Sequence, residues 1–306
     1  MQVKKINSLV SIITITRNRA HLIGRCIESI QKQTYTYYEH IIIDSSTDDS
    51  TKYVIETYSD KKIVYIQLKE YLSIPQTIWL AFEKSSGAFI TFLDDDDEYL
   101  PLKIQKQISL IEDLPEDFGM VYCWMSYFDD VTKQYLKTHS ATLRGYVANE
   151  VVETPIVSGT PTFFIKRHVF HEIGGWKNEN EIGVISDWEL GARICQKWKV
   201  DFVAESLVNI YINHGSVRMS DKGYYKNTSE KFVTFHKYFL SHFFDIFERY
   251  PAKSVQHLYG LSSNLMRLGR WKEAKKYYYL LLKLNPTIKN YLLPIYCFFK
   301  QVKNGN

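Results

Sequence analysis

Four consecutive aspartates, Asp94 to Asp97, are the side chains in this sequence best suited to chemistry. They directly follow the apolar run of residues 88–93, which is typical of a buried strand. Adjacent carboxylates repel one another and resist losing their hydration, so a divalent cation would stabilise them. Carboxylate oxygens at this density suit Mg²⁺ or Mn²⁺, which would keep positions open for substrate phosphates. A solvated acidic loop is the alternative, but the position directly after a strand favours a metal site.

Three further side chains could take part in a reaction or bind a ligand. Ser186 and Asp187 precede a helical pattern over residues 188–198, which they could cap, and Asp187 could instead act as a general base. His214 lies next to Gly215 and is either structural or a contact to a metal or phosphate. Arg218, close by, could pair with a diphosphate.

The elements that would position these side chains alternate between strand and helix patterns. Apolar runs predict strands at residues 10–14, 40–44, 63–68 and 88–93, with amphipathic helical patterns between them. This alternation predicts a parallel, doubly wound sheet, whose ligands bind beyond the carboxyl ends of its strands. The polar turn at Thr16, the carboxylate of Asp44 and the acidic run from Asp94 all follow strands, so we expect them to converge on one crevice.

The rest of the chain has a different pattern of predicted elements. Further strands are predicted near residues 121–128, 163–165 and 202–212, and the pattern is helical from about residue 224. Residues 258–286 have the spacing of one tetratricopeptide-type helix pair, a unit that normally recurs. We therefore expect a catalytic domain over residues 1–223 and a helical extension over residues 224–306, with the helix pair at about 255–288.

Composition excludes several classes of protein. The chain has 306 residues, 45% of them hydrophobic, which allows a sizeable core. Its net charge of +4 suits anionic substrates or an anionic membrane surface and does not indicate nucleic acid. Its four cysteines show no paired spacing, and neither a signal peptide nor a run of about 20 apolar residues is visible. These features predict a cytoplasmic chain.

The motifs resemble those of glycosyltransferase family 2, over about residues 8–220. The resemblance rests on segments that occur in the expected order: Thr16-Arg17-Asn18-Arg19, Ile41-Ile42-Ile43-Asp44, Gly87 through the strand to Asp97, Gly174-Gly175-Trp176 and Ser186-Asp187-Trp188-Glu189-Leu190. It implies a GT-A fold, which is Rossmann-like with a mostly parallel central sheet and flanking helices, here followed by a small C-terminal α-helical region. It also implies an inverting, hexosyltransferase-type enzyme of EC class 2.4 in cell-surface polysaccharide or glycan biosynthesis.

The resemblance further implies a UDP-, GDP- or dTDP-sugar donor, a glycan or lipid-linked acceptor, and Mg²⁺ or Mn²⁺ as cofactor. Asp187 would be the catalytic base, and the metal would be held by Asp96, Asp94 and His214. The nucleotide-sugar would be bound by Thr16, Arg17, Asn18, Asp44, Ser45, Asp94, Asp95 and Arg218. Ser45 stands where many relatives have a second Asp and Arg17 where an aromatic residue is common, so the choice of nucleotide stays open.

Two other functions compete with this interpretation. A nucleotidyltransferase also uses a metal at such a sheet, but residues 16–20 lack the glycine its phosphate loop usually needs. A catalytically silent binding or scaffold protein could have lost Asp96 and Asp187, which are present here. The aromatic and basic segment at residues 291–300 would either pack on the catalytic domain or dock peripherally at the inner membrane face.

Overall fold

The computed structural model describes residues 8–155, 159–184, 186–216, 228–287, 290–292 and 295–296. The chain divides into two compact units. The first contains Met1–Val147, Pro155–Trp176 and Leu190–Ser216, and the second contains Ala148–Thr154, Lys177–Glu189 and Val217–Asn306. The second unit thus includes residues 148–154, 177–189 and 217–223 from the range expected for the catalytic domain, while the boundary between residues 223 and 224 stays a prediction.

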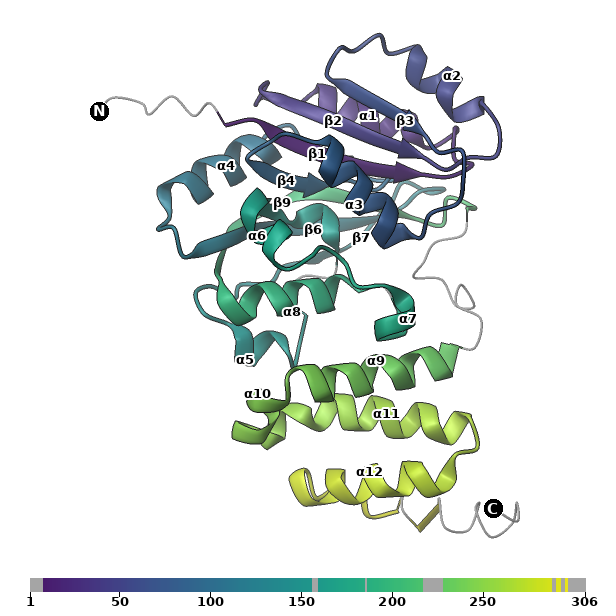
Figure 1. The fold of residues 1–306 in the computed structure, drawn as a ribbon, viewed down its shortest axis with the longest axis vertical. Coiled ribbons are helices and arrows are strands. Elements are labelled where there is room, and N and C mark those ends of the chain that lie inside the picture. The colour runs from purple at the N-terminus through teal and green to yellow at the C-terminus, as the bar shows by residue number, and fades with distance from the viewer. Residues whose placement is uncertain are drawn as a thin grey trace. The chain divides into compact units, whose positions relative to one another are not determined.

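A mixed sheet forms the centre of the first unit (Figure 1). In the described residues its order is β3-β2-β1-β4-β8-β6-β9-β5, and β7 pairs with β6. The strands are β1 (Val10–Thr16), β2 (Tyr38–Asp44), β3 (Ile63–Gln67), β4 (Phe89–Phe92), β5 (Glu98–Tyr99), β6 (Phe118–Asp129), β7 (Tyr135–His139), β8 (Phe164–Lys166) and β9 (Lys199–Ile212).

The N-terminal strands are parallel, as the alternating pattern predicts. β1 pairs in parallel with both β2 and β4, and β2 pairs in parallel with β3. Thr16 lies opposite Asp44 in this register, and Ile13 lies opposite Phe92. The carboxyl ends of β1, β2 and β4 therefore share one edge of the sheet. This confirms the predicted convergence of the polar turn, Asp44 and the acidic run.

Helices cover the sheet. Those of the first unit are α1 (Ile23–Gln31), α2 (Ser50–Glu56), α3 (Ile74–Lys84), α4 (Lys103–Asp113) and α6 (Arg167–Glu172), with a short 3-10 helix at Thr160–Thr162. On α1 the apolar side chains recur every three or four residues, so they share one face. Ile23 and Ile27 from that face pack with Ile42 of β2 and Ile55 of α2.

The second unit is helical. It contains α5 (Ala148–Val151), α7 (Glu179–Ile182), α9 (Thr228–His242), α10 (Phe244–Arg249), a 3-10 turn at Pro251–Ser254, α11 (Val255–Arg267) and α12 (Trp271–Leu284), while α8 (Asp187–Lys197) begins in it and continues in the first unit. Its core packs Val233 of α9 against Leu261 and Leu265 of α11 and Tyr278 and Leu281 of α12. The predicted helix pair is therefore present, and its tetratricopeptide character stays a prediction.

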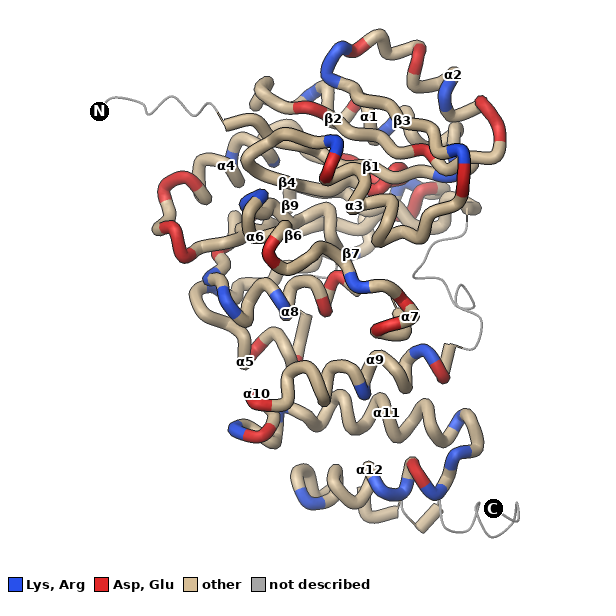
Figure 2. Tube along the Cα trace, in the orientation of Figure 1, with Lys and Arg blue, Asp and Glu red and all other residues tan. Residues whose placement is uncertain are grey.

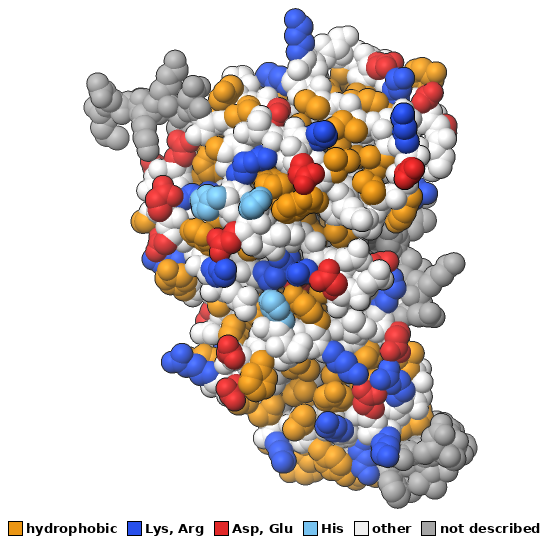
Figure 3. Space-filling model, viewed as in Figure 1, with side chains coloured by type: hydrophobic (Ala, Val, Ile, Leu, Met, Phe, Trp, Pro, Cys, Tyr) orange, Lys and Arg blue, Asp and Glu red, His pale blue; other side chains and the backbone are white. Residues whose placement is uncertain are grey.

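Figure 2 shows several basic residues along α12. One face of the helical unit presents basic, acidic and hydrophobic side chains (Figure 3). Across the part of the chain that the structure describes, none of the helices combines the length and the apolar character needed to cross a bilayer.

Candidate functional site

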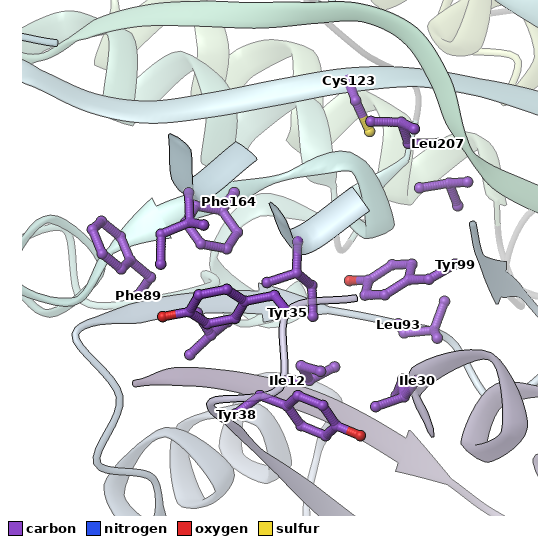
Figure 4. Packing of buried hydrophobic residues seen from close by; sticks show 14 of the residues in the cluster. Ile12, Ile30, Tyr35, Tyr38, Phe89, Leu93, Tyr99, Cys123, Phe164 and Leu207 are labelled. Carbon is purple, nitrogen blue, oxygen red and sulfur yellow. The ribbon is translucent and has the colours of Figure 1, made fainter. Parts of the chain in front are cut away.

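The acidic run is anchored on both sides in the core of the first unit. Leu93, just before Asp94, and Tyr99, at the end of β5, are both 1% exposed and pack in the same cluster as Ile12 and Phe164 (Figure 4). The Tyr99 hydroxyl donates to the carbonyl of Phe92 at 2.5 Å. The loop between these anchors is therefore short and firmly tied to the sheet.

Three carboxylates of this loop converge. One oxygen from each of Asp94, Asp96 and Asp97 lies within 4.8 Å of the others. Asp96 and Asp97 are buried, and Asp94 is exposed. Oxygen donors around one point are the ligands that Mg²⁺ and Mn²⁺ prefer, and buried carboxylates require a positive partner. The residues present therefore fit a divalent cation, and Asp97 joins the two aspartates predicted for it.

The fourth carboxylate, Asp95, points to the end of β1. Its Oδ2 accepts a hydrogen bond from the Thr16 hydroxyl at 2.7 Å, and its Oδ1 accepts one from Arg19 Nη1 at 2.8 Å. The same Arg19 nitrogen lies 3.2 Å from Asp96 Oδ2. Burial raises the pKa of the Asp95 carboxyl to about 6, and the nearby Arg19 guanidinium opposes that rise. Asp95 thus ties the loop to β1, and Arg19 already supplies positive charge to it.

His214 lies beside this loop. Its side chain is 1% exposed and its Nε2 is 2.9 Å from Asp96 Oδ2, an ion-pair distance, although Nε2 makes no hydrogen bond among the described residues. The Ser216 backbone N–H donates to Nδ1 at 3.2 Å, which assigns the proton of a neutral ring to Nε2. Ligation of a metal through Nε2 would require Ser216 to release Nδ1. His214 therefore contacts Asp96, and its ligation of a metal stays a prediction.

Asp44, the other predicted carboxylate at this edge, is fully buried. Its Oδ1 accepts from the Ser46 backbone N–H at 2.8 Å, and its Oδ2 accepts from the Tyr65 hydroxyl at 2.9 Å. The Ser45 backbone N–H donates to the Thr16 carbonyl at 3.0 Å. Asp44 and Ser45 therefore hold the loop after β2 against the end of β1, and their contact with a nucleotide stays a prediction.

Asn18 links the same two loops. Its φ of +54° is left-handed, a conformation that Asn adopts more readily than most residues. Its backbone N–H donates to Ser46 Oγ at 2.7 Å, and its Oδ1 accepts from the Thr47 N–H at 2.9 Å. The exposed Arg17 beside it has its guanidinium carbon 5.2 Å from the centre of the Tyr71 ring. The structure therefore brings the predicted donor residues of these two loops to one edge.

Asp187 is the first residue of α8 and belongs to the second unit. The Ser186 hydroxyl accepts a long hydrogen bond of 3.4 Å from the Glu189 backbone N–H, so Ser186 caps the start of α8 as predicted. The role of Asp187 as a base stays a prediction. Arg218 lies outside the described residues.

Sequence reasoning missed Arg19, Arg25 and Tyr211. Arg19 directly follows Asn18 in the polar turn, so its place in that turn is the signal that could have found it. Arg25 donates to the carbonyl of Asp96, 71 residues away, and Tyr211 donates to Asp97. The first contact depends on how α1 packs beside the acidic loop and the second on where β9 lies in the sheet, and local sequence specifies neither.

Comparison with known proteins assigns the chain to a family. The profile of glycosyl transferase family 2 matches residues 11–174, more than half of the chain. The UDP-Glc:alpha-D-GlcNAc-diphosphoundecaprenol beta-1,3-glucosyltransferase WfgD of Escherichia coli is 34% identical over 103 residues. That match covers 34% of this chain and 41% of WfgD, so this chain spans less than half of that relative.

Two solved structures share the fold. S. aureus TarS 1-349 in complex with UDP-GlcNAc has a TM-score of 0.61 at 14% identity, over 97% of this chain and 92% of that one. The mannosyltransferase PcManGT from Pyrobaculum calidifontis, in complex with GDP-Man and Mn²⁺, has a TM-score of 0.56 at 16% identity, over 98% and 88%. These similarities confirm the predicted GT-A type of α/β fold. Together with the profile match, they show that the chain belongs to glycosyl transferase family 2 and is a glycosyltransferase.

Proposed function

We propose that this glycosyltransferase moves a sugar from a nucleotide-diphosphate sugar to an acceptor hydroxyl with inversion, in the synthesis of a cell-surface polysaccharide or glycan. The observation that carries the proposal is the convergence of carboxylates from Asp94, Asp96 and Asp97 at the carboxyl ends of parallel strands. The names of TarS in complex with UDP-GlcNAc and of PcManGT with GDP-Man support a UDP- or GDP-sugar, with a dTDP-sugar also open. The name of WfgD supports a lipid-linked or glycan acceptor.

Asp94, Asp96 and Asp97 would hold Mg²⁺ or Mn²⁺, with His214 as a further ligand. When bound, such an ion supplies positive charge for the diphosphate that leaves the sugar. Asp95 contributes differently, because its two oxygens accept from Thr16 and Arg19 and thereby orient the loop.

The donor's nucleotide would lie along the loops after β1 and β2, in contact with Thr16, Arg17, Asn18, Asp44 and Ser45. Asp94 and Asp95 would face its ribose, and Arg218 its diphosphate. The hydrogen bonds between these two loops support the proposal, because they preorganise both before a donor arrives.

Asp187 would act as the general base. Its carboxylate would take the proton of the acceptor hydroxyl while that oxygen forms a bond to the anomeric carbon. The bond between that carbon and the diphosphate oxygen would break on the opposite face, and the electron pair would leave with the diphosphate. One displacement of this kind inverts the configuration of the sugar. The order of motifs that ends with Asp187 supports this assignment.

Peripheral contact with the inner membrane face would bring the enzyme to a lipid-linked acceptor. On α12, the exposed side chains of Lys272, Lys276, Tyr279, Leu280 and Lys283 recur at spacings of three and four and so form one outward stripe. This stripe contains no acidic residue. Lysines beside aromatic side chains suit an anionic membrane surface.

Thermal unfolding of the purified protein with UDP, GDP, dTDP or CMP, with and without Mn²⁺, tests the donor site. A ligand that binds only the folded state raises its stability, so we expect one nucleotide to raise the Tm in a Mn²⁺-dependent manner. Asp96→Asn should abolish that rise, whereas Asp113→Asn, which changes an exposed aspartate at the end of α4, should preserve it. The absence of any nucleotide effect on the wild-type protein would contradict the proposal.

Asp187→Asn tests the base. The variant should keep the nucleotide-dependent rise in Tm while its transfer rate falls about 10²- to 10⁴-fold, the usual contribution of general base catalysis. Full turnover by this variant would remove Asp187 from the mechanism.

A further inference from the structure

Arg25, on α1, contacts the acidic loop from the side of its backbone. Its Nη1 donates to the carbonyl oxygen of Asp96 at 3.0 Å, and its Nη2 donates to Asp130 Oδ1 at 2.7 Å. Its guanidinium carbon lies 3.9 Å from the centre of the Tyr211 ring. The planar guanidinium thus makes two directed hydrogen bonds and one stacking contact, a combination for which arginine is suited and lysine is not.

Tyr211, near the end of β9, holds the next two residues of the same loop. Its backbone N–H donates to Asp97 Oδ1 at 3.0 Å, and its hydroxyl donates to Glu98 Oε2 at 2.9 Å. Three consecutive loop residues, Asp96 to Glu98, are therefore each bonded to Arg25 or to Tyr211.

Asp130, the carboxylate that pairs with Arg25, is itself held in place by further contacts. Asp130, which follows β6, receives a second ion pair from Lys133 Nζ at 2.6 Å. Its backbone N–H donates to the Ile212 carbonyl at 2.7 Å, which joins it to the end of β9. The same strand end leads to His214, whose Nε2 lies 2.9 Å from Asp96 Oδ2.

We infer that Arg25 and Tyr211 form a clamp that positions the acidic loop for its divalent cation. The inference rests on the proposed function, because that function gives the loop its metal. Arg25 and Tyr211 are positioning residues, since they act through Asp96, Asp97 and Glu98. A metal site loses affinity when its ligands are displaced by about an ångström. If Arg25 no longer holds the backbone carbonyl of Asp96, the carboxylate of the same residue should shift and bind the cation more weakly.

The test compares Arg25→Met, Arg25→Lys and Tyr211→Phe by Mn²⁺ binding, measured by electron paramagnetic resonance in the presence of UDP and of GDP. Arg25→Met should weaken Mn²⁺ binding at least tenfold, as loss of a supporting partner around a metal site typically does. Arg25→Lys should lose less, because it retains the charge and one hydrogen bond. Tyr211→Phe should lose least, because its backbone bond to Asp97 remains.

The control is Arg144→Met, which removes an arginine that is largely exposed and pairs with Asp201 at 3.1 Å. It should bind Mn²⁺ as the wild-type protein does. In transfer assays, a higher Mn²⁺ concentration should restore the rate of Arg25→Lys. Because bound Mn²⁺ also stabilises the folded state, this result counts only for a variant that is folded without metal. Circular dichroism without metal shows which variants are folded. If Arg25→Met is unfolded, the comparison rests on Arg25→Lys and Tyr211→Phe.

The outcomes separate the clamp from the function on which it rests. Wild-type Mn²⁺ affinity in all folded Arg25 and Tyr211 variants would overturn the clamp alone. A wild-type protein that binds no Mn²⁺ with either nucleotide would overturn the proposed metal role and the clamp with it.

Discussion

The acidic loop of the first unit and the histidine pair of the second bury ionisable groups in opposite ways. Asp95, Asp96 and Asp97 are 3%, 2% and 0% exposed, and Arg19 lies within 3.2 Å of two of them. In the helical unit, His236 Nδ1 lies 3.2 Å from His257 Nδ1, and Nε2 of His257 lies 2.8 Å from the Val152 carbonyl oxygen.

The surroundings explain the difference. The His257 ring packs against Trp188, Phe239 and Phe247. Its Nε2–H donates to Val152, which leaves Nδ1 to accept from His236 Nδ1–H, so both nitrogens of His257 have partners while both rings are neutral. Burial accordingly lowers the pKa of both histidines to about 4. The helical core buries its two histidines in the neutral form. The acidic loop instead buries carboxylates close together, and these need positively charged partners.

The largest effect in this comparison should come from Arg19→Gln. Without Arg19, Asp95 and Asp96 lose a positive partner, and breaking a buried ion pair costs about 3–5 kcal/mol. Because the Arg19 side chain is 20% exposed, we expect a loss of about 3 kcal/mol in the free energy of unfolding without metal. Urea denaturation in EDTA and in Mn²⁺ measures this, and Mn²⁺ should recover much of the loss because it replaces the missing charge.

Lys197→Gln is the control, since it removes a cation whose ion pair with Glu172 is exposed on both sides. Its free energy of unfolding should change by less than about 1 kcal/mol. An Arg19→Gln protein as stable as the wild type in EDTA would show that the loop carries its buried charge without a resident cation.

Much of this loop was predictable from the sequence, and its partners were not. The runs that end at Thr16, Asp44 and Leu93 are long and apolar, so their parallel pairing and shared edge follow from local pattern. Which carboxylate meets Arg19 depends on the turn after β1. The contacts of Tyr211 depend on β9, whose pairing with β6 shifts register between Phe118 and Met125.

The histidine pair had no sequence signal at all. His236 and His257 lie 21 residues apart on different helices, and neither has the spacing of a metal or catalytic motif. Their contact depends on how α9 and α11 pack. A lone histidine in a helical pattern could equally have been exposed, because aromatic residues on both helices allow more than one arrangement.

A smaller effect is expected from acid. The unfolded chain binds protons at the usual histidine pKa of 6.5, whereas folded His236 and His257 resist them down to about 4. As the pH falls from above 6.5 towards 4, the unfolded state gains more protons and the free energy of unfolding falls. We expect a loss of about 2 kcal/mol from this pair between pH 7.5 and pH 5.8, about 1 kcal/mol for each ring, measured by urea denaturation.

His236→Asn removes one titrating ring while its amide can still donate to His257. Its stability should depend less on pH than that of the wild type, whereas His171→Asn, at an exposed histidine of the first unit, should follow the wild type. Ring-proton NMR titration gives an independent measure. A pKa near 6.5 for both His236 and His257 would contradict the neutral pair.

The smallest effect concerns the outside of the helical unit, where charge is again exposed. Lys272→Gln together with Lys276→Gln removes two positive charges from the outward stripe of α12. A lysine near an anionic membrane contributes up to about 1 kcal/mol, so we expect binding to vesicles with phosphatidylglycerol to fall about tenfold in a flotation assay at low salt. Lys61→Gln with Lys69→Gln removes two exposed charges from the first unit and should leave flotation unchanged. Wild-type flotation of the Lys272→Gln, Lys276→Gln variant would mean that these two lysines do not contribute to membrane binding.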